Sequence, residues 1–253
     1  MEQPAKRSLS LSVVIPAFNE ARRLPPTLVD MIFFLEGRGE PYEIIVVNDG
    51  STDTTSDVVK KIQKLCGKVR VIDQPRNFGK GFAVKTGVLA SAGKLVLMAD
   101  ADGATPIEEL ARLEHAIEAG ADIAIGSRAL ASKETAIHTS IHRRLFGRVF
   151  NACVNFLVVP GIADTQCGFK LFSRSAAHFL FGRLRSERFS FDVELLYIAQ
   201  RAGMQITEVP INWNNIPESK INLVADSTRM FLDLLRFRYW HRDVDRKEWA
   251  AEH

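Results

Sequence analysis

Two aspartates stand two positions apart in "MADADGA" (residues 98–104), directly after the apolar run "KLVL". Residues i and i+2 of an extended chain point to the same side, so the carboxylates of Asp100 and Asp102 converge if the strand continues that far. Two anions brought together need a cation or a proton, which makes this pair a candidate metal site. A solvated turn at Gly103 is the ordinary alternative, because short motifs of this kind often arise by chance.

The elements that would position this pair are short runs rich in Val and Ile, alternating with helical patterns. The runs are "LSVVIPAF", "YEIIVVND", "KVRVIDQ", "KLVLMAD" and "ADIAIGSR", all within residues 11–128. Continuous apolar strands separated by helices predict an α/β fold whose mostly parallel sheet is buried on both faces. Farther on we expect a helix that ends at Gly203, a strand in "ITEVPINW" and a last helix over residues 223–240.

The carboxyl ends of the predicted strands carry the polar and acidic segments "PAFNE", "NDGSTD", "DADGA" and "GSR". Ligands of open α/β sheets bind beyond this edge. The first strand-to-helix turn, "PAFNEARRLP", has no glycine, and the sequence has no G-x-x-x-x-G-K-S/T loop, so neither glycine-rich phosphate cradle is predicted. Such an edge would instead hold a diphosphate through a divalent cation, because Mg²⁺ favours one or two carboxylates together with substrate phosphates.

The composition is that of a globular protein. Of 253 residues, 46% are hydrophobic and 25% are charged, and this length is enough for one large domain or two small ones with a proper core. The net charge of +3 does not by itself indicate nucleic acid, and we expect no nucleic-acid partner. The three cysteines are odd in number and far apart, so neither a disulfide framework nor a zinc site is predicted, and a reducing compartment fits.

Basic residues gather in "HRRLFGR" (142–148), "GRLRSER" (182–188) and "RFRYWHR" (236–242). Aromatic and aliphatic side chains are interleaved with them, an arrangement that suits a membrane surface or a phosphate. For any one cluster, a solvated helix face is an equally good interpretation.

Residues 139–159 predict an amphipathic helix, with apolar side chains on one face and Arg and Asn on the other. This helix either lies at a membrane interface or packs on the core like an ordinary surface helix. The longest apolar region, 145–163, contains Arg148, Asn151 and Asn155, so we predict no membrane span.

The segments "VVIPAFNE", "VVNDGSTD", "RNFGKGFAVKTG", "MADADGAT" and "GSR", in this order, resemble the inverting family-two glycosyltransferases with the nucleotide-diphospho-sugar (GT-A) fold. Three later segments, "DTQCGFKLF", "FDVELLYIAQ" and "NWNNIPESK", are similar to the dolichyl-phosphate β-glucosyltransferases and, more distantly, to the dolichyl-phosphate mannose synthases. The resemblance covers residues 10–240 and strongly favours the metal interpretation of the aspartate pair.

The resemblance implies a UDP-sugar donor and a divalent metal, Mg²⁺ or Mn²⁺. Asp100 and Asp102 match the positions that hold the metal. In the mannose synthases a Gln two places further can also coordinate it, whereas this chain has Ala104 there. The positions that match donor-binding residues are Pro16, Ala17, Glu20, Asp49, Lys80, Asp100, Ala101, Asp102 and Gln166.

Among these, Asp49 suits its implied role physically. A carboxylate can accept the imide N–H of uracil, and Gly50 next to it leaves room for a flat ring. The alternative is a helix N-cap in "NDGSTD", although Ser51 or Asp53 can fill that role instead.

The implied acceptor is a polyprenyl phosphate, either dolichyl or undecaprenyl. Its second pKa lies near ~6, so at neutral pH most of it is a dianion that needs no general base. The oxyanion would attack the anomeric carbon opposite the leaving UDP, with inversion, while positive charge stabilises the phosphates. The cations at matching positions are Arg128, Arg143, Arg144 and Lys220, each of which also has a surface ion pair as an alternative. The residues expected to act in catalysis are Asp102, Asp192, Arg128 and Lys220.

Asp192 and Glu194 match the acidic segment that supplies a base in family members acting on sugar hydroxyls. Two residues apart on a helix, they do not share a face. We expect Asp192 to face the site, where it orders Lys220 or contacts the sugar. A first-turn carboxylate that stabilises its own helix is the alternative.

The segment "DTQCGFK" places Asp164, Gln166 and Lys170 around a turn at Gly168. These side chains either bind sugar hydroxyls or make bonds local to the turn.

We therefore expect one GT-A domain over residues 1–240, with a nucleotide-sugar-binding half at 10–128, an acceptor-binding half at 129–240 and a polar tail at 241–253. Because the first strand is predicted close to the start of the sequence, we expect no N-terminal anchor like that of the eukaryotic glucosyltransferases. We accordingly expect a protein attached peripherally to the cytoplasmic face of a membrane through an interfacial helix at 139–159.

The expected reaction is transfer of glucose from UDP-glucose to a polyprenyl phosphate. Three alternatives remain at this point: the same chemistry with GDP-mannose, transfer to a glycan hydroxyl with Asp192 or Glu194 as a true base, and nucleotide-sugar binding without catalysis.

Overall fold

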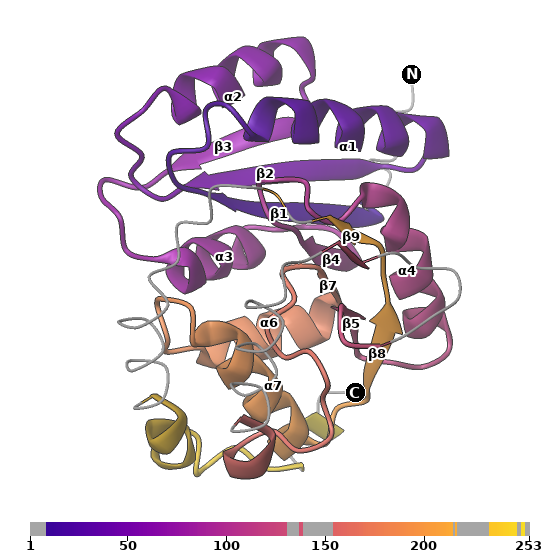
Figure 1. Cartoon of the computed structure of the whole chain (residues 1–253), viewed down its shortest axis with the longest axis vertical. Helices are drawn as coiled ribbons and strands as arrows, with labels where there is room; N and C mark the ends of the chain where they lie inside the picture. The colour runs from indigo at the N-terminus through magenta and orange to yellow at the C-terminus, as the bar shows by residue number, and fades with distance from the viewer. Residues whose placement is uncertain are drawn as a thin grey trace, which may run out of the picture.

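The computed structural model describes residues 9–130, 137–138, 154–214, 216, 233–246 and 249–250, which form two sheets and the helices around them (Figure 1). The strands are β1 (Leu11–Ala17), β2 (Tyr42–Asn48), β3 (Val69–Asp73), β4 (Leu95–Met98), β5 (Ile123–Ser127), β6 (Ile137–His138), β7 (Lys170–Ser173), β8 (Ile206–Pro210) and β9 (Trp213–Asn214). The helices are α1 (Leu24–Arg38), α2 (Thr55–Leu65), α3 (Lys80–Leu89), the 3₁₀ turn η1 (Ile107–Glu109), α4 (Leu110–Glu118), α6 (Arg174–Arg183) and α7 (Phe191–Ala202).

The large sheet has the strand order β3-β2-β1-β4-β7-β5-β8. Every neighbouring pair is parallel except those that β7 makes with β4 and β5. The α/β prediction of a mostly parallel sheet is thus confirmed, and the five predicted apolar runs coincide with β1 to β5. All seven residues of β1 are buried, as expected of a strand covered on both faces.

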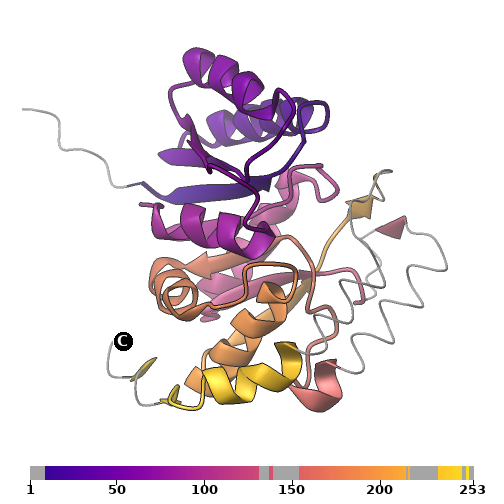
Figure 2. The same ribbon diagram turned by 90° about the vertical axis from the view of Figure 1, so that its left-hand side faces the viewer.

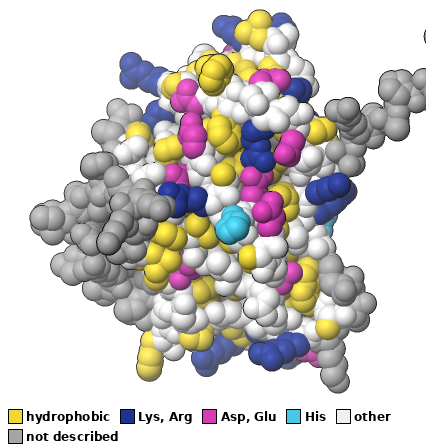
Figure 3. Space-filling model, turned by 90° about the vertical axis from the view of Figure 1, so that its right-hand side faces the viewer, with side chains coloured by type: hydrophobic (Ala, Val, Ile, Leu, Met, Phe, Trp, Pro, Cys, Tyr) yellow, Lys and Arg dark blue, Asp and Glu magenta, His cyan; other side chains and the backbone are white. Residues whose placement is uncertain are grey.

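Helices cover this sheet on both sides. Figure 2 shows α1 and α2 on one side of β1 and α3 on the other. The α3 helix packs on β1 and β2 and continues into a layer with α6, which in turn contacts α7. On the face that carries α1 and α4, acidic, basic and hydrophobic side chains are interspersed (Figure 3).

Among the elements that were not predicted, β7 and α6 matter for the site. Because β7 runs antiparallel, its first residue pairs with the last residue of β4, Lys170 with Met98. The same residue pairs with Ile125 of β5. The antiparallel direction therefore brings the amino end of β7 to the edge of the sheet at which the parallel strands finish.

The C-terminal part corrects one expectation. Residues 241–253 were predicted to be a polar tail, yet His241 and Val244 are buried, and the ring of Trp249 meets that of Phe179 edge-on at 5.4 Å. Part of this segment therefore belongs to the core. Residues 154–157 and 233–240 are helical, whereas most of the predicted interfacial helix, residues 139–153, lies outside the described residues. Among the described residues, no helix is both long and apolar enough to cross a membrane.

Candidate active site

The candidate site lies at the carboxyl ends of β1 and β4. From β1 the chain moves outward to β2 and β3 and then returns to β4 on the other side, which makes this crevice the point where the strand order reverses. The pairing of β1 with β4 stops at Val14 and Met98. Since the carbonyl of Val14 bonds toward β4, the nitrogen of Pro16 also faces that side, just past the end of β4. A proline fits there because no ladder hydrogen bond is lost.

The first two strand-to-helix turns are tied together by Asn19, a residue that sequence reasoning missed. Its backbone has a positive φ of 55°, which Asn tolerates better than most residues. The Asn19 backbone N–H donates to Ser51 Oγ (2.9 Å), and its side-chain Oδ1 accepts from the Thr52 N–H (2.8 Å). These bonds fix the crevice wall that contains the predicted donor-binding residues.

Glu20 and Ala17 lie in that wall, and both already have partners within the protein. The buried carboxylate of Glu20 forms a two-bond ion pair with Arg23, at 2.5 and 2.7 Å. The carbonyl of Ala17 accepts the backbone N–H of Asp49 at 2.8 Å. Arg23 was not among the predicted residues, although its charge also acts on Asp102.

Asp49 is buried, and both of its carboxylate oxygens hold the loop that precedes α3. Oδ1 accepts the N–H of Phe78 at 2.8 Å, and Oδ2 accepts that of Gly79 at 2.9 Å. Asp49 thereby fixes the start of α3, whose first residue is Lys80. The contact of Asp49 with a nucleotide base stays a prediction.

The space beside Gly50 is not open, contrary to the expectation that it leaves room for a flat ring. Gly50 has a φ of +65°, and a Cβ at this position would lie 2.2 Å from the backbone carbon of Arg76. The glycine is needed because the loop crosses it at close range. At the start of α2, Asp53 rather than Asp49 accepts the N–H of Thr55, at 2.9 Å.

The aspartate pair does not lie on one extended strand. The β4 strand ends at Met98 and a turn follows at residues 101–102, so the two-residue spacing no longer sets the direction of the side chains. Lys80 Nζ lies 2.6 Å from Asp100 Oδ1. The Asp102 Oδ1 accepts the N–H of Ala104 at 3.1 Å, and Ala101 between the two aspartates is buried.

The electrostatics of this pair fit a cation. Burial and the neighbouring charge of Asp100 raise the pKa of Asp102, and the opposing effects of the Ala104 N–H, Arg23 and Lys80 do not offset them. A divalent ion would relieve this excess negative charge, and two carboxylates suit hard cations such as Mg²⁺ and Mn²⁺. Within the described ranges no cluster of three or more His, Cys, Asp or Glu forms a metal site, so further ligands would come from substrate and water.

Arg128 follows β5 and reaches the same edge. Its guanidinium holds Asp164 through two bonds, from Nε (2.7 Å) and Nη2 (2.9 Å), and its backbone N–H donates to the same carboxylate. Burial alone would lower the pKa of Arg128, but Asp164 raises it, and Arg128 in turn holds the pKa of Asp164 below its usual range. The guanidinium also lies 5.5 Å from the ring centre of Trp213, a residue that was not predicted.

Asp192 faces the strand-end edge, as predicted, but its partner is Lys170. The fully buried ammonium of Lys170 donates to Asp192 Oδ1 and to the carbonyl of Cys167 (2.6 Å). Burial raises the pKa of Asp192, while the charges of Lys170 and Lys80 oppose that shift. The bond to the Cys167 carbonyl agrees with the local turn bonding that was one expectation for Lys170, whereas its buried ion pair with Asp192 was not predicted.

Glu194 points away from Asp192, which confirms that the two do not share a face. Its oxygens accept the backbone N–H groups of Arg185 (2.8 Å) and Ser186 (2.7 Å), and His241 Nε2 lies 2.7 Å from Oε1. Glu194 is entirely buried by these contacts, so it serves as a clamp for the loop after α6.

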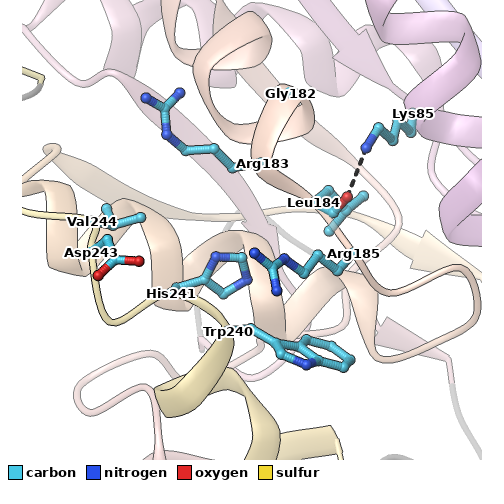
Figure 4. Close-up of a pocket in the computed structure, with 9 residues that line it drawn as sticks. All are labelled: Lys85, Gly182, Arg183, Leu184, Arg185, Trp240, His241, Asp243 and Val244. Carbon is cyan, nitrogen blue, oxygen red and sulfur yellow. Dashed lines mark hydrogen bonds between the residues drawn. The ribbon is translucent and has the colours of Figure 1, made fainter.

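Three predicted cations, Arg143, Arg144 and Lys220, lie outside the described residues. Gln166 is half-buried in the turn before Gly168. The described residues also form a pocket of about 430 Å³ between α3, the end of α6 and residues 240–244 (Figure 4). None of the predicted site residues lines it, and one lining residue, Lys85, already donates to the carbonyl of Leu184 at 2.7 Å.

Comparison with known families identifies the chain. Residues 12–181 match glycosyl transferase family 2, and the chain belongs to this family. It is 43% identical to the human dolichyl-phosphate beta-glucosyltransferase over 265 residues, covering 97% of this chain and 81% of the relative. It is 45% identical to the mouse protein of the same name (94% and 77% covered) and 40% identical to that of Saccharomyces cerevisiae (94% and 76% covered).

Solved structures share the fold at low sequence identity. One is the glucosyl-3-phosphoglycerate synthase of Mycobacterium tuberculosis in complex with Mn²⁺ and UDP-glucose, with a TM-score of 0.65, 20% identity, and 91% and 79% of the two chains covered. Another is the mannosyl-3-phosphoglycerate synthase of Rubrobacter xylanophilus, with a TM-score of 0.69, 16% identity, and 93% and 74% covered. The GT-A fold predicted from the sequence is confirmed.

Proposed function

We propose that this glycosyltransferase transfers glucose from UDP-glucose to a polyprenyl phosphate, with inversion at the anomeric carbon. The names of the relatives, which are 40–45% identical to this chain, support the glucosyl group and the phosphate acceptor. Peripheral attachment to the cytoplasmic face of a membrane is part of the same proposal, because the acceptor is a membrane lipid.

The observation that carries the proposal is that neither candidate base is free. Asp192 is paired with Lys170 and only 4% exposed, and Glu194 is fully buried with both oxygens engaged. A sugar hydroxyl would need one of them to remove its proton. A phosphomonoester is mostly ionised at neutral pH, its second pKa lying near ~6, and therefore needs no base.

The remaining charges suit such a reaction. Asp100 and Asp102 would hold the metal, Mg²⁺ or Mn²⁺, which when bound supplies positive charge to the leaving diphosphate. Lys80 lies against Asp100 and is only 23% exposed, so its ammonium is positioned for an anionic group in the crevice. Burial alone would lower the pKa of Lys80, but the charges of Asp100 and Asp192 raise it, which keeps this group cationic.

In the reaction, an oxygen of the acceptor phosphate forms the new bond to the anomeric carbon, and the bond from that carbon to the diphosphate oxygen breaks. Lys80 and Arg128 provide charge to the two phosphate groups. The paired Asp164 neutralises much of Arg128, so we assign Arg128 to orientation of the acceptor rather than to strong binding. Arg143, Arg144 and Lys220 complete the proposed phosphate-binding set.

The test is an assay with each labelled nucleotide sugar, a polyprenyl phosphate and Mg²⁺ or Mn²⁺. We expect label from UDP-glucose in the lipid phase and a β-linkage by NMR. If label enters the lipid phase only from GDP-mannose, the donor is GDP-mannose and not UDP-glucose. Transfer to a neutral glycan but not to the polyprenyl phosphate would show that the proposed acceptor is wrong. Asp192 would then have to separate from Lys170 in order to act as a base.

A further inference from the structure

Large hydrophobic side chains are exposed at the end of the molecule formed by residues 154–157 and 233–242. Phe156 is 89% exposed, Tyr239 is 70% exposed and Leu235 is 59% exposed. Figure 2 shows the two helical segments side by side at the bottom of the molecule. They also touch directly, because Arg238 Nη2 donates to the carbonyl of Leu157 at 2.8 Å.

The helical spacing of the second segment explains this surface. Leu235 lies three and four residues before Arg238 and Tyr239, so these three side chains share one face of the helix at 233–240, and Arg242 follows in the turn after that helix. The opposite face is core, since Leu234 and Phe237 are buried. The segment is therefore amphipathic with a mixed apolar and cationic outer face, which is the pattern of helices that lie in a membrane interface.

Cations surround the exposed apolar groups. The side chains of Arg236 and Arg242 are 59% and 67% exposed, and the guanidinium of Arg242 lies 5.4 Å from the ring centre of Tyr239. Asp233 and Asp243 offset part of this charge, at 3.3 and 3.6 Å from Arg236 and Arg242. The excess remains positive, which matches an anionic surface.

One packed contact and one stretch of chain connect this surface to the candidate site. Tyr197 of α7 stacks on Phe237, with ring centres 6.3 Å apart, and α7 also carries Asp192, about 7.5 Å away along the axis at ~1.5 Å per residue. The segment after Phe156 leads within twelve residues to Gly168, which touches Asp100. A lipid whose phosphate reaches the site would thus have its chain near this surface.

A second exposed apolar pair provides the contrast. Val29 and Phe33 on α1 are 58% and 82% exposed, but the exposed carboxylates of Asp30 and Glu36 lie on the same helix. That pair has apolar area beside acidic side chains, and the one basic residue of α1, Arg38, is paired with Glu114. It is therefore a matched control for hydrophobicity alone.

We propose that Phe156, Leu235 and Tyr239, with Arg236, Arg238 and Arg242, form a docking surface for an anionic phospholipid bilayer. The rings insert among the headgroups, and the guanidinium groups stay at the phosphates. The proposal rests on the proposed function only in its choice of a membrane lipid as acceptor. It assigns the membrane contact to described residues: Phe156, near the end of the helix predicted over 139–159, and side chains of the segment 233–242.

The experiment compares sedimentation with vesicles of phosphatidylcholine alone and of phosphatidylcholine with phosphatidylserine. The test variant is Phe156→Ser/Leu235→Ser/Tyr239→Ser, the control is Val29→Ser/Phe33→Ser, and the charge variant is Arg236→Gln/Arg242→Gln. We expect wild type and control to bind the anionic vesicles and the test variant to bind at least about tenfold more weakly. The charge variant should lose the preference for phosphatidylserine and the dependence on salt.

Unaltered binding by a folded test variant, or equal losses in test and control variants, would overturn the proposal. So would a wild type that is dimeric while the test variant is monomeric, because the surface would then be an interface between copies. Activity on a short, water-soluble prenyl phosphate separates the two proposals. It should be equal in wild type and test variant, and its absence from wild type would count against the proposed function alone.

Discussion

The carboxylate of Asp100 lies against the Cα of Gly168, so closely that a Cβ on residue 168 would be 2.0 Å from Oδ2. The turn before β7 thus supports from behind an aspartate that we propose as a metal ligand. Gly168→Ala would push this flexible carboxylate aside and leave the backbone in place. We expect about a hundredfold loss of kcat/KM, as for other displacements of about 1 Å near reacting groups, and weaker Mn²⁺ binding by EPR.

The matched control is Gly182→Ala, on α6, where an added Cβ meets nothing within 4 Å. This variant should keep full activity and gain up to about 1 kcal/mol in unfolding free energy, as Ala favours a helix over Gly. An equally large loss of activity in both variants, or normal Mn²⁺ binding by Gly168→Ala, would contradict the supporting role of Gly168.

Asp102→Asn should abolish turnover and yet stabilise the metal-free protein at neutral pH. The pKa of Asp102 is raised in the folded state by burial and by Asp100, so the ionised form is disfavoured there. Folding then takes up a proton, and the stability from this group declines as pH rises from the unfolded value of about 3.9 through the higher folded value.

Thermal melts at neutral pH with and without Mn²⁺ measure this effect. Mn²⁺ should raise the Tm of wild type and leave that of Asp102→Asn unchanged. A variant that is less stable than wild type without metal, or is stabilised equally by Mn²⁺, would refute the assignment of Asp102.

Asp49→Ala should lower stability as well as raise the KM for UDP-glucose. The substitution leaves the N–H groups of Phe78 and Gly79 without their acceptors, at a cost of about 1–3 kcal/mol for a buried unsatisfied group. Urea unfolding measures this loss, with Asp57→Ala, an exposed aspartate in the first turn of α2, as the control. A higher KM without a loss of stability would show that base binding is the whole role of Asp49.

The buried pair of Lys170 and Asp192 predicts strong coupling. Lys170→Met or Asp192→Leu alone leaves an unpaired buried charge and should cost about 3–5 kcal/mol, whereas the double variant should recover most of that loss. If Asp192 is not a base, the double variant also keeps the pH profile of kcat/KM. Additive losses of unfolding free energy in urea would contradict the coupling of the pair. A pH profile of kcat/KM that loses its acidic limb in the double variant would show that Asp192 acts as a base.

Much of the fold followed from local pattern. Continuous Val and Ile runs predicted β1 to β5 because strands buried on both faces carry apolar residues throughout. The β7 strand, with four residues, begins with Lys170, and a buried ammonium interrupts the apolar pattern on which such a prediction depends. That lysine is only tolerated because Asp192, 22 residues away, meets it across the fold.

The sequence predicted which residues stand at the strand ends better than it predicted the contacts that their side chains make. The positions of Asp100 and Asp102 at a strand end followed from the sequence, but the end of β4 at Met98 cancelled the geometry expected from their spacing. Likewise a nucleotide contact was predicted for Asp49, but not the hydrogen bonds by which Asp49 closes a loop 29 and 30 residues later in the chain. Such partners are long-range, and no local periodicity encodes them.

The placement of β7 sets an order of assembly during synthesis. Strands β1 to β4 pair with one another and are complete by residue 98, but β5 finds its neighbours only in β7 and β8, which emerge from residue 170 onward. At ~5–20 residues per second the ribosome leaves β5 unpaired for several seconds. The insertion of β7 then joins the two parts of the sheet and brings Lys170, Asp100 and Arg128 to one edge in a single late step. Nascent chains stalled before residue 170 should therefore hold a protected first half and a protease-sensitive β5, with no competent site.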